Sequence, residues 1–296
     1  MARMDEWITR RTLYTGRLFE LGHVVCRPTP EVRTEVEYPA LNALALPISG
    51  VFAVHHGPRR YVLATPNHAV FLASGSPCRI TFPGNVGDEC LVLRLSSEGL
   101  ARLAPKSMSR DGFAPRFLAT HAVLSPAAIL AQGLLWRRLS RDEADPLLVE
   151  ELGIGLLESA LGAGRRAQGG GHSRYVRRVK EAICASPERR WTLDELSGIA
   201  GVSPYHLAHV FSREVGTSVY RYTVRQRLAR ALNAVLDSNL DLTSIALDTG
   251  FASHSHFTAR FRAFFGLTPE ALRRSAGSGS AAQLRKIVTA QPAAAA

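Results

Sequence analysis

The sequence predicts a two-domain protein, with a β-rich N-terminal domain and an all-α C-terminal domain. Three observations support this fold class. The 296 residues amount to about two domains of roughly 150 residues each. Short apolar runs separated by turn residues fill the first half, and helical periodicity replaces them after the glycine-rich segment 162–171. With 46% hydrophobic and 21% charged residues, the composition excludes a disordered or collagen-like chain.

The apolar runs of the first half predict antiparallel strands in a barrel or sandwich, because Gly, Pro and Asn separate them. These runs are Leu41–Val54, Arg60–Ala64, His68–Ala73, Cys78–Phe82 and Glu89–Leu95. Two helices are expected next, since each segment begins with Pro and repeats apolar residues every three or four positions. They span Pro126–Ser140 and Pro146–Leu161. Their leucines either form a dimer interface or pack within one subunit: Leu134, Leu135, Leu139, Leu152, Leu156 and Leu157.

Composition sets the expected domain limits. We expect the first domain to cover residues 1–163, a flexible linker 164–173, the second domain 174–275 and a disordered tail 276–296.

Two segments of the second domain repeat the same spacing. Leu193–Gly201 and Leu242–Gly250 are eight-residue intervals, and Ser203 and Ser253 are each followed by Phe at +8 and Gly at +13. A helix that ends in glycine, a tight turn and a serine suited to N-capping define a helix-turn-helix unit. The sequence therefore predicts two such units.

Apolar residues define the expected inner faces of these units. Leu193, Leu196 and Ile199 support the first unit, with Leu207, Val210 and Phe211 as anchors of its second helix. The corresponding residues of the second unit are Leu242, Ile245, Ala246, Phe257, Phe261 and Phe264.

A long basic helix, Val219–Asp237, is predicted between the units. About 18 residues span about 27 Å, so the two units could enter successive major grooves of DNA. Its expected outward arginines are Arg221, Arg225, Arg227 and Arg230.

Residues 175–274 resemble the AraC/XylS family of bacterial transcription regulators. The stretches GVSPYHLAHVFSREVGTSVYRYTVRQRLARAL and LTSIALDTGFASHSHFTARFRAFFGLTPEALRR carry this resemblance. The resemblance implies that both units bind double-stranded promoter DNA and that the protein works with RNA polymerase. It also implies an N-terminal cupin-like (jelly-roll) barrel that binds a small-molecule effector or forms a homodimer.

Base-reading positions follow from the same resemblance. They fall on Tyr205, Ala208, His209, His254, Ser255, His256, Thr258 and Ala259. Alanine cannot form a bidentate hydrogen bond with a base, and at Ala259 the family commonly has arginine, while Arg260 is expected to face another way. We therefore expect the second unit to position the protein more than it discriminates between sequences.

Phosphate contacts are expected from cations and serines around the reading helices. The candidates are Ser203, Arg213, Arg221, Arg225, Ser253, Arg262, Arg273 and Arg274. The formal net charge of +11 suits a polyanionic partner. A DNA binder without sequence preference would explain the charge, but not two capped helices at matched spacing.

Catalysis is not expected. A metal-dependent cupin enzyme is the alternative, but His55 and His56 are adjacent on a predicted strand and point to opposite faces. The sequence names no catalytic residue, metal ligand or cofactor. Cys26, Cys78, Cys90 and Cys184 are expected to be reduced and mostly buried. Without an apolar run of about 18 residues or a signal-peptide pattern, a cytoplasmic, nucleoid-associated protein is expected.

Overall fold

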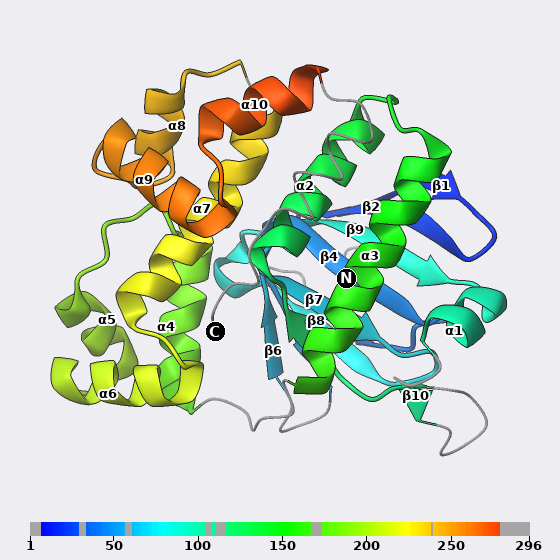
Figure 1. Ribbon diagram of the computed structural model, residues 1–296. Helices are drawn as coiled ribbons and strands as arrows, with labels where there is room; N and C mark the ends of the chain where they lie inside the picture. The colour runs from blue at the N-terminus through cyan, green and yellow to red at the C-terminus, as the bar shows by residue number, and fades with distance from the viewer. Residues whose placement is uncertain are drawn as a thin grey trace.

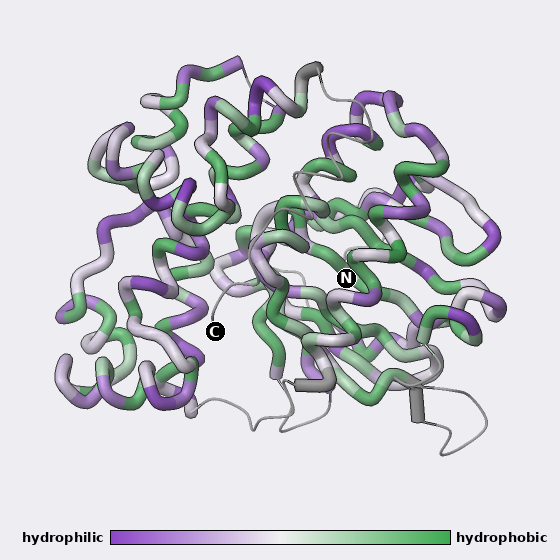
Figure 2. Tube along the Cα trace, in the orientation of Figure 1, coloured by the Kyte–Doolittle hydropathy of each residue, from purple (hydrophilic) through white to green (hydrophobic). Residues whose placement is uncertain are grey.

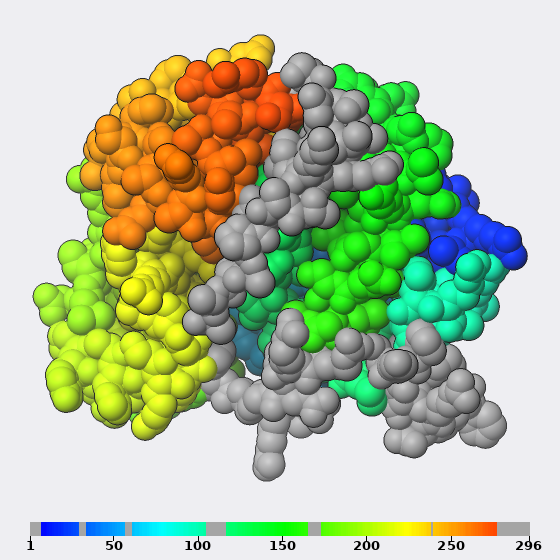
Figure 3. Space-filling model, viewed as in Figure 1, coloured from blue at the N-terminus to red at the C-terminus, as the bar shows by residue number. Residues whose placement is uncertain are grey.

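The computed structural model of the protein describes residues 7–29, 34–56, 61–104, 108–109, 116–166, 173–237 and 239–278. Its N-terminal half contains two antiparallel sheets, and its C-terminal half is helical (Figure 1). The two parts pack side by side, and Figure 3 shows the C-terminal part in yellow and orange on one side and the N-terminal helices in green on the other. The predicted two-domain fold class is therefore confirmed.

The larger sheet has six strands in the order β1-β2-β9-β4-β7-β12, and the smaller has four in the order β3-β8-β5-β6. The strands are β1 Ile8–Thr15, β2 Phe19–Cys26, β3 Val36–Glu37, β4 Ala43–Gly50, β5 Phe52–His55, β6 Tyr61–Ala64, β7 His68–Leu72, β8 Cys78–Thr81, β9 Asp88–Leu95 and β12 His121–Val123. Two short strands, β10 Met108–Ser109 and β11 Arg116–Phe117, form a separate pair.

The five predicted apolar runs all contain strands. The longest run, Leu41–Val54, divides into β4 and β5 because Gly50 has a φ of 76° and the chain passes from the larger sheet to the smaller one. A Cβ atom on Gly50 would overlap the Gly87 carbonyl oxygen, so only glycine fits this crossing.

Three apolar clusters show how the layers are stacked. The first fills the space between the sheets and includes Ala45, Phe52 and Val92. Another joins the outer face of the six-stranded sheet to helices α2 Pro126–Ser140 and α3 Pro146–Arg166. The third joins the outer face of the four-stranded sheet to the first helices of the C-terminal domain. Figure 2 shows the strands between these layers as largely hydrophobic.

The six leucines of α2 and α3 that were considered for a dimer interface are buried in the core of one subunit. Of the two alternatives, packing within the subunit is confirmed, because a side chain closed off by the sheet cannot also form an exposed dimer face. Helix α3 continues through Gly164 to Arg166, so the first three residues of the predicted linker are helical. Residues 167–172 of that linker lie outside the described residues.

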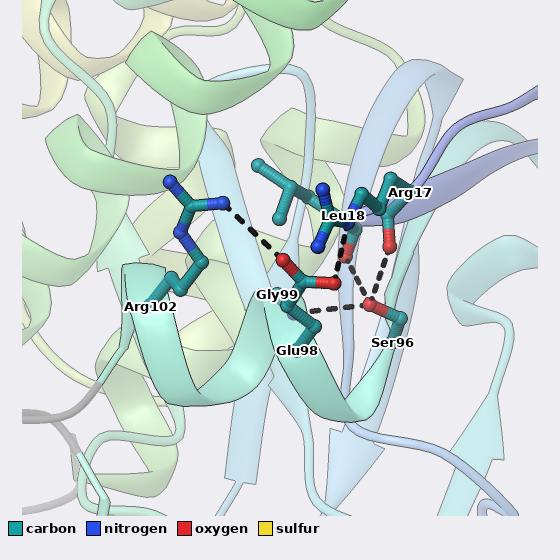
Figure 4. A network of polar contacts seen from close by, with 6 residues as sticks. All are labelled: Arg17, Leu18, Ser96, Glu98, Gly99 and Arg102. Atoms are coloured by element: carbon teal, nitrogen blue, oxygen red, sulfur yellow. Dashed lines mark hydrogen bonds and ion pairs between the residues drawn. The ribbon is translucent and has the colours of Figure 1, made fainter.

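A polar network attaches the short helix α1 Ser97–Leu103 to the turn between β1 and β2 (Figure 4). Ser96 caps the helix by accepting from the Gly99 amide at 3.0 Å, and its hydroxyl donates to the Leu18 carbonyl at 3.0 Å. Glu98 pairs with Arg17 at 2.7 Å and with Arg102 at 3.2 Å. A side chain at Gly99 would overlap the Leu18 carbonyl oxygen.

The C-terminal domain has seven described helices. They are α4 Arg174–Ala185, α5 Leu193–Ala200, α6 Pro204–Val215, α7 Val219–Asp237, α8 Leu242–Asp248, α9 His254–Phe265 and α10 Pro269–Ser278. The long helix α7 matches its predicted bounds. Helix α10 includes residues 276–278, which were assigned to the tail, and the rest of the predicted tail lies outside the described residues.

Helix α7 joins the two domains. Gly133 of α2 allows close approach, because a Cβ there would lie 3.0 Å from Leu232 and Leu236 of α7. Asn233 donates to the Ile48 carbonyl at 2.7 Å, and buried Asn67 donates to Gln226 at 2.9 Å. The helix between the two helix-turn-helix units is therefore part of the contact with the N-terminal domain. This domain, formed by the two sheets with α1, α2 and α3, is called the barrel domain below.

Candidate DNA-binding interface

The first helix-turn-helix unit is built from local capping signals. Thr192 and Glu195 form a reciprocal capping box at the start of α5, and its hydrogen bonds lower the pKa of Glu195. Gly201 ends the helix with a φ of 73°, a conformation that glycine adopts without strain. Ser203 then caps α6 by accepting from the His206 amide at 3.3 Å.

The inner face of α5 differs from the prediction. Leu193 and Ile199 are both 38% exposed, whereas Leu196 and Ala200 are buried. The expected stripe of three large residues is therefore wrong at two positions. The buried residues of α5 are instead Leu196, Ser197 and Ala200.

Helix α6 presents its predicted reading side chains outward. Leu207, Val210 and Phe211 are buried as expected. Tyr205 is 85% exposed, His209 is exposed, and Ala208 is half-buried. The Tyr205 and His209 side chains form no hydrogen bond to another described residue, so their donors, acceptors and rings are available to a partner.

The second unit has the same capping signals as the first, and its core contains more aromatic rings. Asp241 caps α8 through the amides of Thr243 and Ser244 at 2.8 and 3.0 Å. A hydrogen bond from the Ser244 hydroxyl at 2.6 Å, together with these amide bonds, lowers the pKa of Asp241. Gly250 has a φ of 88°, and Ser253 caps α9.

Phenylalanine rings fill the interior of this second unit. Phe257 and Phe261 are fully buried as predicted. The predicted anchor Phe264 is only half-buried, and Phe265 takes the fully buried position beside it.

The predicted reading side chains of α9 interact with one another. Thr258 lies 3.4 Å from His254. Arg260 donates to His256 at 3.4 Å. Two further members, Ser255 and Ala259, are exposed. The structure thus places all eight predicted base-reading positions on two helix surfaces. On α9, some of these side chains already contact other side chains of the protein.

Two residues outside the predicted set lie beside this surface. Tyr220 at the start of α7 lies 3.4 Å from His256, and the Arg260 guanidinium lies 5.9 Å from the Tyr220 ring centre. The spacing of Arg260 four residues after His256 could have indicated their contact. No local pattern indicates Tyr220, which comes from another helix.

Most predicted phosphate contacts are exposed on the C-terminal domain. Ser203 and Ser253 use their hydroxyl oxygens as helix caps. The exposed arginines of this set are Arg213, Arg221, Arg262 and Arg274, and Arg274 also pairs with Glu270 at 3.4 Å.

Arg225 and Arg273 occupy positions that differ from the prediction. Arg225 donates to the Asn67 side chain at 3.1 Å and to the Leu124 carbonyl, and burial lowers its pKa. Arg273 donates to the carbonyls of Val235 and Leu240 at 3.2 and 2.9 Å. Both guanidiniums replace water with protein carbonyl and amide oxygens, so neither is available to phosphate in this structure.

The other outward arginines of α7 are also engaged, apart from exposed Arg221. Arg227 donates to the Pro187 and Arg189 carbonyls at 2.7 and 2.9 Å. Arg230 pairs with Glu188 at 2.5 Å. Arg221 and Arg230 are therefore exposed as predicted, whereas Arg225 and Arg227 are half-buried because their guanidiniums bond to neighbouring segments.

Comparison with known families agrees with this architecture. A helix-turn-helix domain model matches residues 196–275, and an AraC-binding-like domain model matches residues 9–162, which is about half of the chain. The chain belongs to the AraC family of transcriptional regulators. Its barrel and its paired helix-turn-helix units are the two parts expected of an AraC family member.

Relatives of this AraC family member carry regulator names. The HTH-type transcriptional regulator GlxA of Rhizobium meliloti (strain 1021) is 36% identical over 100 residues, 34% of this chain and 31% of that protein. The HTH-type transcriptional activator AarP of Providencia stuartii is 34% identical over 86 residues, 29% of this chain and 64% of that protein. The chain spans less than two thirds of the length of either curated relative.

Among solved structures, a probable AraC family transcriptional regulator from Rhodopseudomonas palustris CGA009 is 32% identical. The match covers 35% of this chain and 98% of that chain, with a TM-score of 0.34.

Within the part of the chain that the structure describes, no group of three or more His, Cys, Asp or Glu side chains could hold a metal ion. No described helix combines the length and the apolar composition needed to cross a bilayer. All four cysteines are free and buried.

Proposed function

We propose that the protein binds promoter DNA sequence-specifically through its two helix-turn-helix units and thereby regulates transcription. The observation that carries this proposal is the pair of capped helices, α6 and α9, whose predicted reading positions lie on two helix surfaces of one domain. The N-terminal residues of such recognition helices reach base edges in the major groove.

The proposed roles divide by exposure and chemistry. Tyr205 and His209 read bases by contact with a thymine methyl group or by donation to a base edge. The α9 residues His254, Ser255, His256, Thr258 and Ala259 fix the position of the domain more than its sequence preference. Phosphates are bound by Arg213, Arg221, Arg262 and Arg274, with Arg260 as an addition.

The remaining assignments follow from family membership. They are an effector within the barrel domain, contact with RNA polymerase, a homodimer, no catalytic activity of its own, and a cytoplasmic, nucleoid-associated location. A homodimer would have to use a surface other than the buried leucines of α2 and α3.

Selection of bound duplexes from a random pool tests the proposal. The full-length chain is used at near-physiological salt, and the bound DNA is sequenced. We expect an enriched motif with two elements about one helical turn apart, because the two units enter successive major grooves. Strongly salt-dependent binding without enrichment would contradict sequence-specific regulation and would indicate an architectural DNA binder.

A further inference from the structure

A cavity of about 380 Å³ lies between the two sheets of the barrel domain. Its volume is within the range of about 300 to 1,000 Å³ that is usual for small-molecule sites. The wall is mostly aliphatic, with Val24, Leu72, Ile80 and Val92, and it contains one aromatic ring, Phe52. Such a wall suits a compact apolar body.

A buried carboxylate lines this apolar cavity. Asp88 lines it and is only 4% exposed. Its described side-chain donors are thiols: Cys90 donates at 2.9 Å, and Cys26 also hydrogen-bonds to it. Burial raises the pKa of both thiols, so they stay neutral and leave the Asp88 charge uncompensated. A buried carboxylate of this kind favours a cationic partner.

The other charges near Asp88 are exposed or already paired. Arg27 lowers the pKa of Asp88 but is itself exposed, and Glu89 raises it. Arg94 lines the cavity and pairs with Glu20 at 2.8 Å.

The two remaining charged residues in the cavity wall have opposite charges. Arg10 is exposed and Glu37 is half-buried. The third thiol in the wall, Cys78, has its pKa raised to about 11, so it is neutral near pH 7. The deepest unpaired charge is therefore negative.

We propose that this cavity binds a small organic cation, an amine on a compact aliphatic or alicyclic body, with its ammonium group against Asp88. This inference rests on the proposed function, because it names the chemical class of the effector of the barrel domain. An anionic ligand would place its charge beside the buried carboxylate, and a neutral ligand would leave that carboxylate unpaired.

Asp88 lies close to the DNA-binding domain. Asp88 also lines a second cavity, of about 270 Å³, between the barrel and α7. Ser49 and Gly50 line it from the barrel side, while Gln226 and Arg230 line it from α7.

Strand β4 links this wall to α7. Its Gly50 pairs with Asp88, and its Ile48 carbonyl accepts from Asn233 of α7. A cation at Asp88 therefore acts on the strand edge that holds the helix between the two helix-turn-helix units.

Isothermal titration of the full-length chain tests the ligand class with three probes of equal shape. Cyclohexylmethylamine is positive, cyclohexylmethanol is neutral, and cyclohexanecarboxylate is negative. We expect the amine to bind at least tenfold more tightly than the alcohol, and the carboxylate to bind more weakly than either. Equal or tighter binding of the carboxylate, or no binding of any probe, would overturn the proposal.

Two variants test the role of Asp88. Asp88→Asn should remove the preference for the amine over the alcohol while keeping the shape of the side chain. Glu89→Gln is the matched control, because Glu89 bonds to His23 at 2.8 Å on the other face of the sheet, and it should keep the preference. Loss of preference in both variants, or in neither, would overturn the role of Asp88.

A pH series on the unmodified chain tests the same point without a substitution. Burial raises the pKa of Asp88 to about 6. Its ionised fraction, and with it the amine affinity, should fall about tenfold between pH 7 and pH 5. Alcohol binding should stay constant, and an amine affinity that does not fall with pH would count against the proposal.

The closing measurement repeats the duplex selection with and without the amine. We expect the amine to change the affinity for the enriched duplex in the unmodified chain but not in Asp88→Asn. Enrichment of a motif without amine binding would reject only the ligand class. Failure to enrich any motif would instead reject the proposed function.

Discussion

The two helix-turn-helix units share their spacing but differ in how free their reading surfaces are. On α6, Tyr205 and His209 extend into solvent without a described hydrogen-bond partner. On α9, His254 contacts Thr258, and Arg260 contacts His256. A side chain already bonded within the protein must exchange that bond to reach a base, so we expect the first unit to contribute more to the proposed base recognition.

The units also differ in their interiors. Phe257, Phe261 and Phe265 stack in the second unit at centroid distances of 5.5 and 4.6 Å, and their cluster continues into α2 and the six-stranded sheet. The first unit instead packs on α4 and the four-stranded sheet, with Phe211 against Tyr222. The second unit is thus part of a core that extends to the N-terminal domain through α2, whereas the first packs on α4 and the four-stranded sheet.

Removing one ring from the aromatic stack should have the largest effect. Phe261→Ala should lower the free energy of unfolding by about 3–5 kcal/mol, since Phe261 is fully buried and the cavity left behind cannot collapse against neighbouring rings. Chemical denaturation followed by circular dichroism measures it. Phe264→Ala, at a half-buried position of the same helix, is the control and should cost less. Equal losses would refute the assignment of a specific core.

Changes to the two reading surfaces should have a smaller and unequal effect. The double substitution Tyr205→Ala and His209→Ala should weaken binding to the selected duplex by about 1–3 kcal/mol and relax its base preference. His254→Ala should weaken it less, because His254 is already in contact with Thr258. Competition with duplexes that carry single base changes distinguishes the two. A larger loss of preference from His254→Ala would reverse the comparison.

The smallest expected effect distinguishes two arginines. Arg262→Ala should weaken binding to every sequence alike and reduce the slope of log affinity against log salt by about 1, because Arg262 is exposed in the last turn of α9. Arg225→Ala should leave this slope unchanged, since its guanidinium bonds to Asn67 and Leu124. Titrations at several salt concentrations measure both. An equal reduction in the two variants would mean that Arg225 leaves the barrel when DNA binds.

Local signals explain what the sequence could predict. Glycine after a helix and serine before the next one act within a few residues, so the bounds of α5, α6 and α9 follow from the chain itself. Pro126 marks the start of α2 for the same reason. The strands β1 and β2 were not predicted. In β1, Thr9, Arg10 and Arg11 break the apolar pattern on an exposed outer strand.

Long-range contacts explain what it could not. Arg225 reads as a surface cation in its own helix, and only the fold brings Asn67, 158 residues earlier, to its guanidinium. Leu193 and Ile199 fit a buried stripe by spacing, but in the folded domain they are partly exposed to solvent. The cavity at Asp88 likewise depends on strands that are far apart in the sequence.

Helix α7 also limits how this regulator could be rebuilt from parts. Its inner residues Leu232 and Leu236 fit the surface opened by Gly133, and its polar residues match carbonyls of the barrel. A chimaera that joins a foreign sensor to the C-terminal domain would leave this face without a complementary partner. Exchange of sensors between such proteins therefore requires the matching α2 surface to move together with α7.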